Sequence, residues 1–383
     1  ALGVGQELSS AHASSFDAES TPAPWIARSW IDDRQRGQYV GSEAMLASKR
    51  MVLKFVLACG LSLASMASSA DQECAHALAI DYASREKTID QLRVLFRAGE
   101  FLQLEENLSC LMNSTARFQS GHMGASAVYW LFRREMPAPG ARPEVANHVK
   151  RWQRQMPDSL FAQFAELRLL YVMAWNARGF GYAGSVSKEQ WATFHAGLAE
   201  AERAILSASP RLKESPILQN LLLAVLLDMP ERRDSARSVF DDGVKKWPQY
   251  YDFYEVALSR LVPRWGGSWD RVDAFIVDWN KRLASTEGDS MYARLYAAII
   301  STDTNVNETR IHWPTMKRSL EDLVNRYPDV SLRNVAACYA CRFNDREYSR
   351  ISFRRLRDDE LMPNVWMRGT DPLECARIAR AGP

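Results

Sequence analysis

Residues 159–182 read SLFAQFAELRLLYVMAWNARGFGY, a helix pattern followed by a turn. One side of this pattern is strongly apolar, with Phe161, Phe164 and Tyr171 at helical spacing. Gly179 follows the last apolar position and predicts the end of the helix. The stretch therefore predicts a buried helix that closes in a turn rich in aromatic side chains.

A second helix is predicted directly after this turn. Ser187 is placed as its N-cap and Gln190 as the third helical residue, which together form a capping box. Val186 and Trp191 occupy the two positions of a hydrophobic staple. We expect this helix to extend to about Ser207. The two helices form a hairpin, and this hairpin is the unit from which we expect the fold to be built.

The rest of the chain after residue 70 also has helical patterns. Residues 88–91 (Thr-Ile-Asp-Gln) fit a capping box, and Gly99 ends the helix that this box would open. Ser215 with Pro216, and further on Ser268, are good helix starts. The other predicted helices span residues 101–112, 125–133, 146–155, 217–229, 232–246, 248–261, 269–283, 290–302, 314–327, 330–342 and 346–357. No segment alternates with period two, so we expect little or no β-structure.

A weak internal repeat indicates how these helices are arranged. A bulky apolar residue and a proline recur at residues 156–157, 247–248 and 327–328, each time before an apolar helix. Helices joined by short loops fit arrays of stacked hairpins, although no window matches the tetratricopeptide consensus. We therefore predict an all-α fold, an irregular, tetratricopeptide-like α-solenoid of helical hairpins, over residues 71–383 as a single domain.

The first 70 residues are expected to lie outside this domain. Residues 45–70 fit a Sec signal peptide, with Lys54 before a short apolar run and small residues Ser68 and Ala70 before cleavage after Ala70. The run is too short to span a bilayer. We expect a periplasmic or secreted protein whose residues 1–44 are a disordered upstream extension from a start placed too early.

Other interpretations of residues 45–70 explain the sequence less well than a cleaved signal peptide. The true start could be Met45 or Met51. A buried N-terminal helix would explain the apolar run but not the order of charge, apolar run and small residues. A lipoprotein would require Cys59 as the acylated residue, and the short run before it makes a poor lipobox.

Composition excludes some classes of function. The 383 residues are 47% hydrophobic and 25% charged, as in ordinary globular proteins, and the formal net charge is +2. Such a small charge does not indicate binding to nucleic acid or to an anionic membrane surface. In the chain after residue 70 we expect no integral membrane segment.

Five cysteines remain after residue 70, and an oxidising compartment would allow disulfides among them. Cys74 and Cys110 flank one predicted hairpin, whereas Cys375 could reach Cys338 or Cys341. The odd number leaves one thiol free. The spacing Cys338-x-x-Cys341 lacks the second ligand pair of a zinc site and the preceding strand of a redox motif. No nucleophile elbow, phosphate loop or dinucleotide fingerprint is present, so we expect no metal and no cofactor.

Several short motifs together resemble a family of uncharacterised helical proteins from Gram-negative bacteria, a domain of unknown function. The resemblance spans most of residues 92–366 and implies an all-helical, repeat-like fold but no activity. Its motifs are Phe101-x-x-Leu104-Glu105 with Phe118 and Gly121; Ala174-Trp175-x-Ala177-Arg178-Gly179-x-Gly181-Tyr182-Ala183 with Val186 and Trp191; Leu261-x-Pro263-Arg264-Trp265-Gly266-Gly267-Ser268; and Asn334, Ala337, Cys341 and Asp345.

Two of these motifs combine indole and guanidinium groups at turns between helices. The structural interpretation accounts for most of their residues, with Trp side chains in the core, glycines at turns and Ser268 as a cap. In a stacked array, however, both turns could line one concave groove, where rings and guanidinium groups bind a ligand. The ligand-binding residues predicted on this hypothesis are Trp175, Arg178, Tyr182, Arg264, Trp265 and Trp269.

The leading functional hypothesis is an exported helical-repeat scaffold that binds a peptide, protein or envelope component in this groove, without catalysis. The alternative is a cell-envelope enzyme that acts on glycan in an α/α fold, which would require two facing carboxylates. A structural subunit of an envelope complex is a third possibility, and a large exposed apolar patch would support it. No catalytic residue is predicted.

Overall fold

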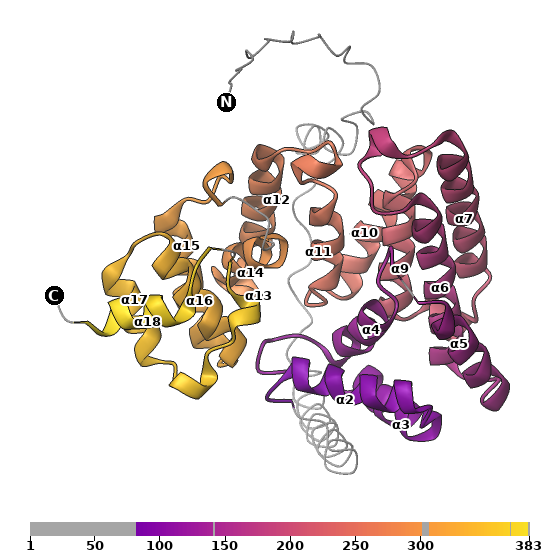
Figure 1. The fold of residues 1–383 in the computed structure, drawn as a ribbon, viewed down its shortest axis with the longest axis horizontal. Coiled ribbons are helices and arrows are strands. Elements are labelled where there is room, and N and C mark those ends of the chain that lie inside the picture. The colour runs from indigo at the N-terminus through magenta and orange to yellow at the C-terminus, as the bar shows by residue number, and fades with distance from the viewer. Residues whose placement is uncertain (1–81, 141, 301–305, 368, 382–383) are drawn as a thin grey trace, which may run out of the picture.

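The computed structural model of the protein describes residues 82–140, 142–300, 306–367 and 369–381. The predicted extension and signal peptide lie outside these ranges, within which the chain is all-α with no β-strand. The α-helices, labelled as in Figure 1, are α2 (Arg85–Ala98), α3 (Phe101–Asn113), α4 (Gly124–Glu135), α5 (Pro143–Gln155), α6 (Leu160–Arg178), α7 (Lys188–Leu206), α8 (Pro210–Lys213), α9 (Pro216–Leu227), α10 (Arg233–Lys246), α11 (Asp252–Ser259), α12 (Trp269–Arg282), α13 (Ala284–Glu287), α14 (Ser290–Ile299), α15 (Trp313–Arg326), α16 (Val330–Arg342), α17 (Arg346–Arg354) and α18 (Pro372–Arg380). The 3-10 helices are η2 (Ala183–Ser185), η3 (Pro230–Arg232), η4 (Pro263–Trp265), η5 (Val306–Glu308), η6 (Asp358–Glu360) and η7 (Pro363–Val365).

Most helix starts follow from capping residues visible in the sequence. Ser187 and Gln190 form the predicted capping box of α7. Ser215 caps α9 with Pro216 at its first position, and Ser268 caps α12. Each of these serine hydroxyls accepts a hydrogen bond from a backbone N–H that the helix itself cannot satisfy. The predicted starts of these three helices are confirmed.

Two predicted helices were wrong in their bounds. The predicted box at residues 88–91 is instead part of α2, which begins at Arg85 behind the N-cap Ser84, and the side chain of Thr88 is buried. The helix predicted over residues 248–261 is shortened to α11. It ends before the segment that leads into Pro263, because a proline disfavours helical backbone at the residue before it.

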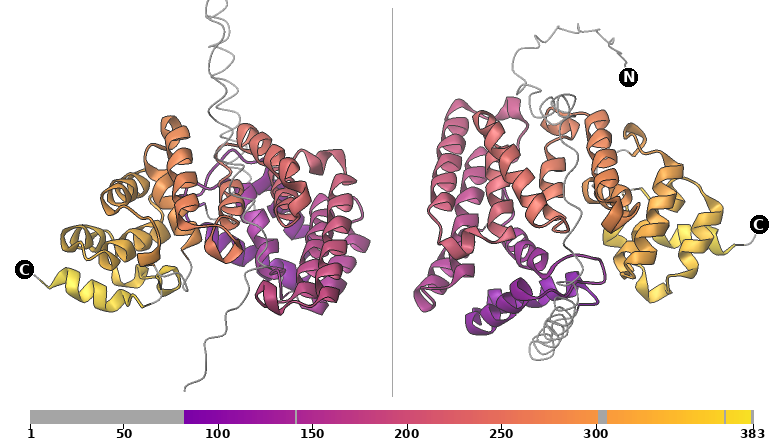
Figure 2. Two further views of the ribbon diagram at one scale, coloured as in Figure 1. Left: turned by 90° about the horizontal axis from the view of Figure 1, so that it is seen from above. Right: turned by 180° about the vertical axis from the view of Figure 1, so that it is seen from behind.

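The helices fall into groups on either side of α11. Figure 1 shows α5 to α10 on one side of α11 and α12 to α18 on the other, and the views in Figure 2 agree. The helix α11 contacts α9 on one side and α14 on the other. All residues of α9 except Gln219 are buried, as expected of a helix that is apolar all round. The all-α prediction is confirmed, whereas the solenoid arrangement stays a prediction.

The cysteines of the C-terminal helices resolve one pairing that the sequence left open. Cys341 of α16 and Cys375 of α18 form a disulfide with their Cα atoms 5.9 Å apart. Cys338 is free, and burial raises the pKa of its thiol to about 11. A thiol that remains protonated is a poor nucleophile, so Cys338 is a structural cysteine. Cys110 is disulfide-bonded, and Cys74 lies outside the described residues.

A loop before α4 joins the N-terminal helices to the C-terminal group. Arg294 of α14 donates from Nη2 to the carbonyl of Ser120, at 2.9 Å. Gly121 has a φ of 85°, and a Cβ atom there would lie 2.5 Å from the ring of Tyr327. Tyr327 is held in place by its hydroxyl, which donates to Glu287 at 2.6 Å. Only glycine fits this joint without moving the ring.

We expect Gly121→Ala to lower the free energy of unfolding by about 2 to 4 kcal/mol, because it adds both backbone strain and a clash with Tyr327. Urea unfolding followed by circular dichroism measures the change. Gly369→Ala is the matched control, since its φ is 76° but its Cβ would meet nothing within 4 Å. Equal losses in the two variants would show that the contact with Tyr327 contributes nothing.

Candidate functional site

The two motifs predicted to share a surface are in contact. Trp175 lies near the end of α6 and Trp265 in η4, and their ring centroids are 5.7 Å apart in an edge-to-face arrangement. The guanidinium of Arg178 lies 5.2 Å from the centroid of Trp175 and 5.7 Å from that of Trp265. Arg264 lies 5.6 Å from the Trp265 ring. Segments far apart in the sequence thus form one cluster of indole rings and guanidinium groups.

The turn after α6 is fixed by Arg178. Gly179 adopts a φ of 79°, and its N–H donates to the carbonyl of Trp175. Arg178 is buried, and its Nη1 donates to the carbonyls of Gly179 and Gly181 at 3.2 and 3.0 Å. Both acceptors lie just beyond the end of α6. Arg178 therefore has a structural role in shaping the turn.

The two glycines of the second motif serve different purposes. Gly266 has a φ of 80°, which favours glycine. Gly267 is required by close packing instead, since a Cβ there would lie 1.8 Å from the carbonyl oxygen of Leu261. The N–H of Gly267 also donates to the carbonyl of Val262 at 3.2 Å. The turn brings Arg264 and Trp265 back onto α6.

Asp228, which the sequence analysis missed, holds this region together. Its Oδ2 accepts hydrogen bonds from the hydroxyl of Tyr171 at 2.8 Å and from Nε1 of Trp175 at 2.9 Å. Its Oδ1 pairs with Arg260, whose Nη2 lies 2.7 Å away. Burial and the nearby Asp228 raise the pKa of Tyr171, so its phenol stays protonated and can donate. We call Asp228, Tyr171, Trp175 and Arg260 the Asp228 cluster.

A pocket of about 490 Å³ opens beside this cluster. Its wall comes from α4, α6, α9, α11, η4 and the loop around residues 137–139. The aromatic residues in the wall are Tyr129, Tyr171, Trp175, Phe180 and Trp265. The charged residues in the wall are Arg133, Arg168, Arg178, Arg260, Arg264 and Glu255. We call this cavity the arginine pocket.

The six residues predicted as a binding site divide into two groups. Four lie in the wall of the arginine pocket: Trp175, Arg178, Arg264 and Trp265. Tyr182 is exposed and lies outside the wall, with its ring centroid 5.5 Å from the guanidinium of Arg264. Trp269 also lies outside the wall, because as the first residue of α12 it packs half-buried against the core.

Arg168 is the most unusual residue of the wall. It is 4% exposed and lies on the apolar face of α6, four residues after Phe164 and three before Tyr171. Its Nη2 donates to the carbonyl of Met136 at 3.2 Å, but its Nε has no hydrogen-bond partner. No carboxylate within the described ranges forms an ion pair with it. Burial lowers the pKa of Arg168, yet an arginine remains charged in proteins.

Glu255 of α11 is the carboxylate in the wall. It is half-buried, and within the described part of the chain its carboxylate forms no hydrogen bond or ion pair. Burial and the neighbouring Asp252 raise its pKa to about 6. The positive charges of Arg85, Arg133 and Arg294 oppose this shift. Glu255 therefore titrates close to neutral pH.

The wall combines an excess of positive charge with aromatic surfaces. Such a site can hold a carboxylate, phosphate or sulfate group by charge-assisted hydrogen bonds and pack an apolar group beside it. Four of the wall residues, Arg168, Tyr171, Trp175 and Arg178, follow one face of α6 over a length of about 15 Å. The sequence could have indicated Arg168, because it interrupts an otherwise apolar helical stripe.

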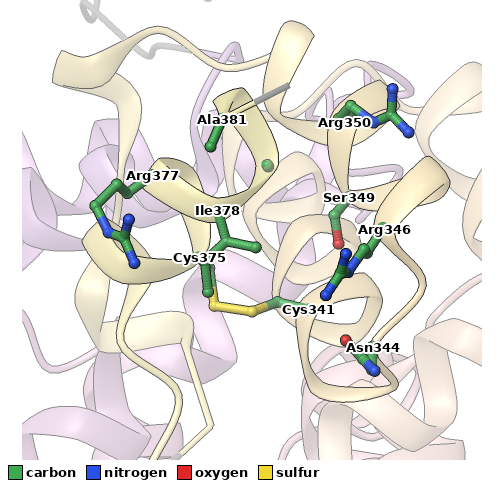
Figure 3. A pocket seen from close by; sticks show the side chains of 10 residues that line it. Cys341, Asn344, Arg346, Ser349, Arg350, Cys375, Arg377, Ile378 and Ala381 are labelled. Atoms are coloured by element: carbon green, nitrogen blue, oxygen red, sulfur yellow. A yellow bond between two sulfur atoms is a disulfide. The ribbon is translucent and has the colours of Figure 1, made fainter. Parts of the chain in front are cut away.

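A second pocket lies beside the disulfide of α16 and α18. Figure 3 shows Cys341 and Cys375 at its floor, with Arg346, Ser349 and Arg350 around it. Its volume is about 260 Å³. No buried polar atom without a partner lies in its wall, so nothing there indicates a bound ligand. Among the residues that the structure describes, no group of three His, Cys, Asp or Glu side chains could hold a metal ion.

Comparison with known proteins gives a match to a family over part of the chain but no activity. Residues 88–226 match a family described as Domain of unknown function (DUF4034). The matched range runs from α2 to the last turn of α9, so it includes the first indole motif and not the second. No curated protein and no solved structure matches the chain. In the part of the chain described by the structure, no helix is both long and apolar enough to cross a membrane.

Proposed function

We propose that this protein is a non-catalytic binding protein whose arginine pocket takes an anionic group of a peptide, protein or envelope component. The observation that carries the proposal is Arg168, a buried guanidinium in the pocket wall without a carboxylate partner. A buried charge that lacks a counter-ion costs several kcal/mol, so such residues are rare unless a ligand compensates them. An anion in the pocket would supply the missing counter-charge.

The alternative, an enzyme that cleaves glycan, has less support from the same wall. Glycoside hydrolysis uses two carboxyl groups that flank the bond to be cleaved. Glu255 is the one carboxyl side chain in the wall, beside five arginines. Asp252, one turn earlier on α11, is buried and accepts a hydrogen bond from Trp130 at 2.7 Å. This balance of charges favours binding of an anion.

Thermal unfolding with added anions tests the proposal. Sodium phenylacetate and sodium sulfate are compared with sodium chloride at equal ionic strength. A bound anion stabilises the folded state by RT ln(1 + [L]/Kd), so Tm should rise with phenylacetate or sulfate above the chloride control. The rise should vanish in Arg168→Met.

Arg203→Met is the matched control for this experiment. Arg203 is an exposed arginine of α7 without an ion pair among the described residues, so the anion effect should persist in its variant. An increase in Tm that is equal in wild type and Arg168→Met would be a general effect of the salt on folding and would refute the proposal. The absence of any increase in wild type would refute it as well.

We further propose that the protein is exported through the signal peptide at residues 45–70. The disulfide between Cys341 and Cys375 supports this, because such bonds persist in oxidising compartments. When the full reading frame is expressed in a Gram-negative host, we expect the periplasmic protein to begin at Asp71. Intact-mass spectrometry measures the N-terminus, and a cytoplasmic product that retains residues 45–70 would contradict export.

A further inference from the structure

We infer that the ligand of the arginine pocket is zwitterionic, a short peptide whose carboxylate binds at Arg168 and whose ammonium group binds at Glu255. This inference rests on the proposed binding function and narrows it. Its basis is that one wall holds two opposite charges, and neither has an ion-pair partner among the described residues.

Arg168 and Glu255 face the same cavity from different helices. Arg168 lies on α6 and Glu255 on α11, and both belong to the wall of the pocket. Beyond the effect of burial, Arg133 of α4 influences the pKa of both residues, so it lies within electrostatic range of each. All three residues, together with Tyr129, belong to the wall of this one pocket.

A ligand that is only an anion should bind here, but less tightly than a zwitterion. It would gain from Arg168 but would bring a negative charge toward Glu255, and like charges that lack solvent repel each other strongly. A ligand with an ammonium group as well turns this repulsion into a second ion pair. The buried guanidinium of Arg168 and the half-buried carboxylate of Glu255 would then each have an opposite charge beside them. A simple anion compensates only Arg168.

The remaining wall favours a peptide with an apolar or aromatic side chain. Tyr129, Tyr171 and Trp175 supply ring surfaces beside Arg168, and rings of this kind stack on aromatic or apolar groups. The volume of about 490 Å³ is that of a small-molecule site and is too small for a folded partner. Free termini of a short peptide supply the carboxylate and the ammonium group on one molecule.

Calorimetric titration with capped and uncapped peptides tests the inference. The probes are L-phenylalanine, Ala-Phe and Ala-Ala-Phe, each free, N-acetylated and as the C-terminal amide. For at least one length, we expect the free form to bind at least tenfold more tightly than both capped forms. Glycerophosphoethanolamine is included because a lipid headgroup also carries both charges.

Variants assign the two charges. Glu255→Gln should weaken the free peptide about tenfold but leave the N-acetyl peptide unchanged or tighter. Arg168→Met should weaken the free and the N-acetylated forms, both of which keep the carboxylate. Glu200→Gln, an exposed carboxylate of α7, is the matched control and should change nothing. Far-ultraviolet circular dichroism confirms that each variant is folded.

The pH dependence gives a second test with opposite signs for the two ligand types. Burial and Asp252 raise the pKa of Glu255 to about 6, so its negative charge is lost as the pH falls from 7 to 5. The free peptide should bind more weakly at pH 5, whereas the N-acetyl peptide should bind more tightly. The termini of the peptide, with pKa values of about 3.5 and about 7.8, stay charged in this range. In Glu255→Gln, the part of the pH dependence that comes from this carboxylate should disappear for both the free and the N-acetyl peptide.

The outcomes separate this inference from the proposed function. N-acetyl peptides that bind as tightly as free peptides, dependent on Arg168, would overturn the zwitterion and leave an anion-binding pocket. Tighter binding of glycerophosphoethanolamine than of every peptide would overturn the peptide and point to a headgroup. If no probe binds, the peptide inference fails, and the stabilisation by phenylacetate or sulfate decides independently whether the pocket binds anions.

Discussion

Replacing Asp228 by alanine is expected to lower the free energy of unfolding by about 3 to 5 kcal/mol. The variant would leave the guanidinium of Arg260 buried without its counter-charge, since its Nη2 lies 2.7 Å from Asp228. It would also remove the acceptor of Tyr171 and of Trp175. For a chain of this size we expect a fall in Tm of about 4 to 6 °C.

The second variant of this experiment separates charge from packing. Adding Arg260→Met to Asp228→Ala removes the unpaired guanidinium, and we expect the double variant to be more stable than Asp228→Ala alone. Differential scanning calorimetry measures both. If Asp228→Ala loses less than about 1 kcal/mol, the typical value of an exposed ion pair, then the cluster does not hold α6 to the ends of α9 and α11.

Replacing Arg168 by methionine is expected to have the opposite effect on stability. In the absence of ligand we expect the free energy of unfolding to rise by about 1 to 3 kcal/mol, because an unpaired buried charge is replaced by an apolar side chain of similar length. The lost hydrogen bond to the carbonyl of Met136 offsets about 1 kcal/mol of this gain. The same variant should lose the stabilisation by anions.

We expect these two effects, higher stability without ligand and no stabilisation by anions, if Arg168 serves ligand binding. We do not expect them if Arg168 only supports the fold. Removal of a structural arginine would destabilise the fold, as we expect for removal of Asp228. Urea unfolding of Arg168→Met without added anion measures the first effect, with Arg203→Met as the exposed control. A loss of more than about 2 kcal/mol in Arg168→Met would assign Arg168 to the scaffold.

Much of the local structure could be predicted from the sequence. Ser187, Ser215 and Ser268 fix helix starts through hydroxyl groups that accept nearby backbone N–H groups, and this requires no knowledge of distant residues. A shared surface for Trp175 and Trp265 could be proposed because both motifs lie at turns between helices, and in the structure the two rings are in contact. Local rules of this kind act over a few residues, so sequence patterns reveal them directly.

The rest of the site depends on tertiary packing, which no local pattern contains. Asp228 follows a mostly apolar helix and looks like an ordinary C-terminal residue until Arg260 is packed against it. Cys338 and Cys341 are one turn apart, and only the position of α18 selects Cys341 for Cys375. Glu255 resembles any solvated carboxylate of an amphipathic helix before the pocket closes around it.

The range of the family match has a consequence for how this protein is divided into units. The match ends at residue 226, yet Glu255, Arg264 and Trp265 of the pocket wall lie beyond that boundary. A fragment cut at the end of the match would retain Arg168 and one wall of the cavity without the opposite wall. The smallest piece of the chain that can carry this pocket is therefore longer than the segment that matches the family.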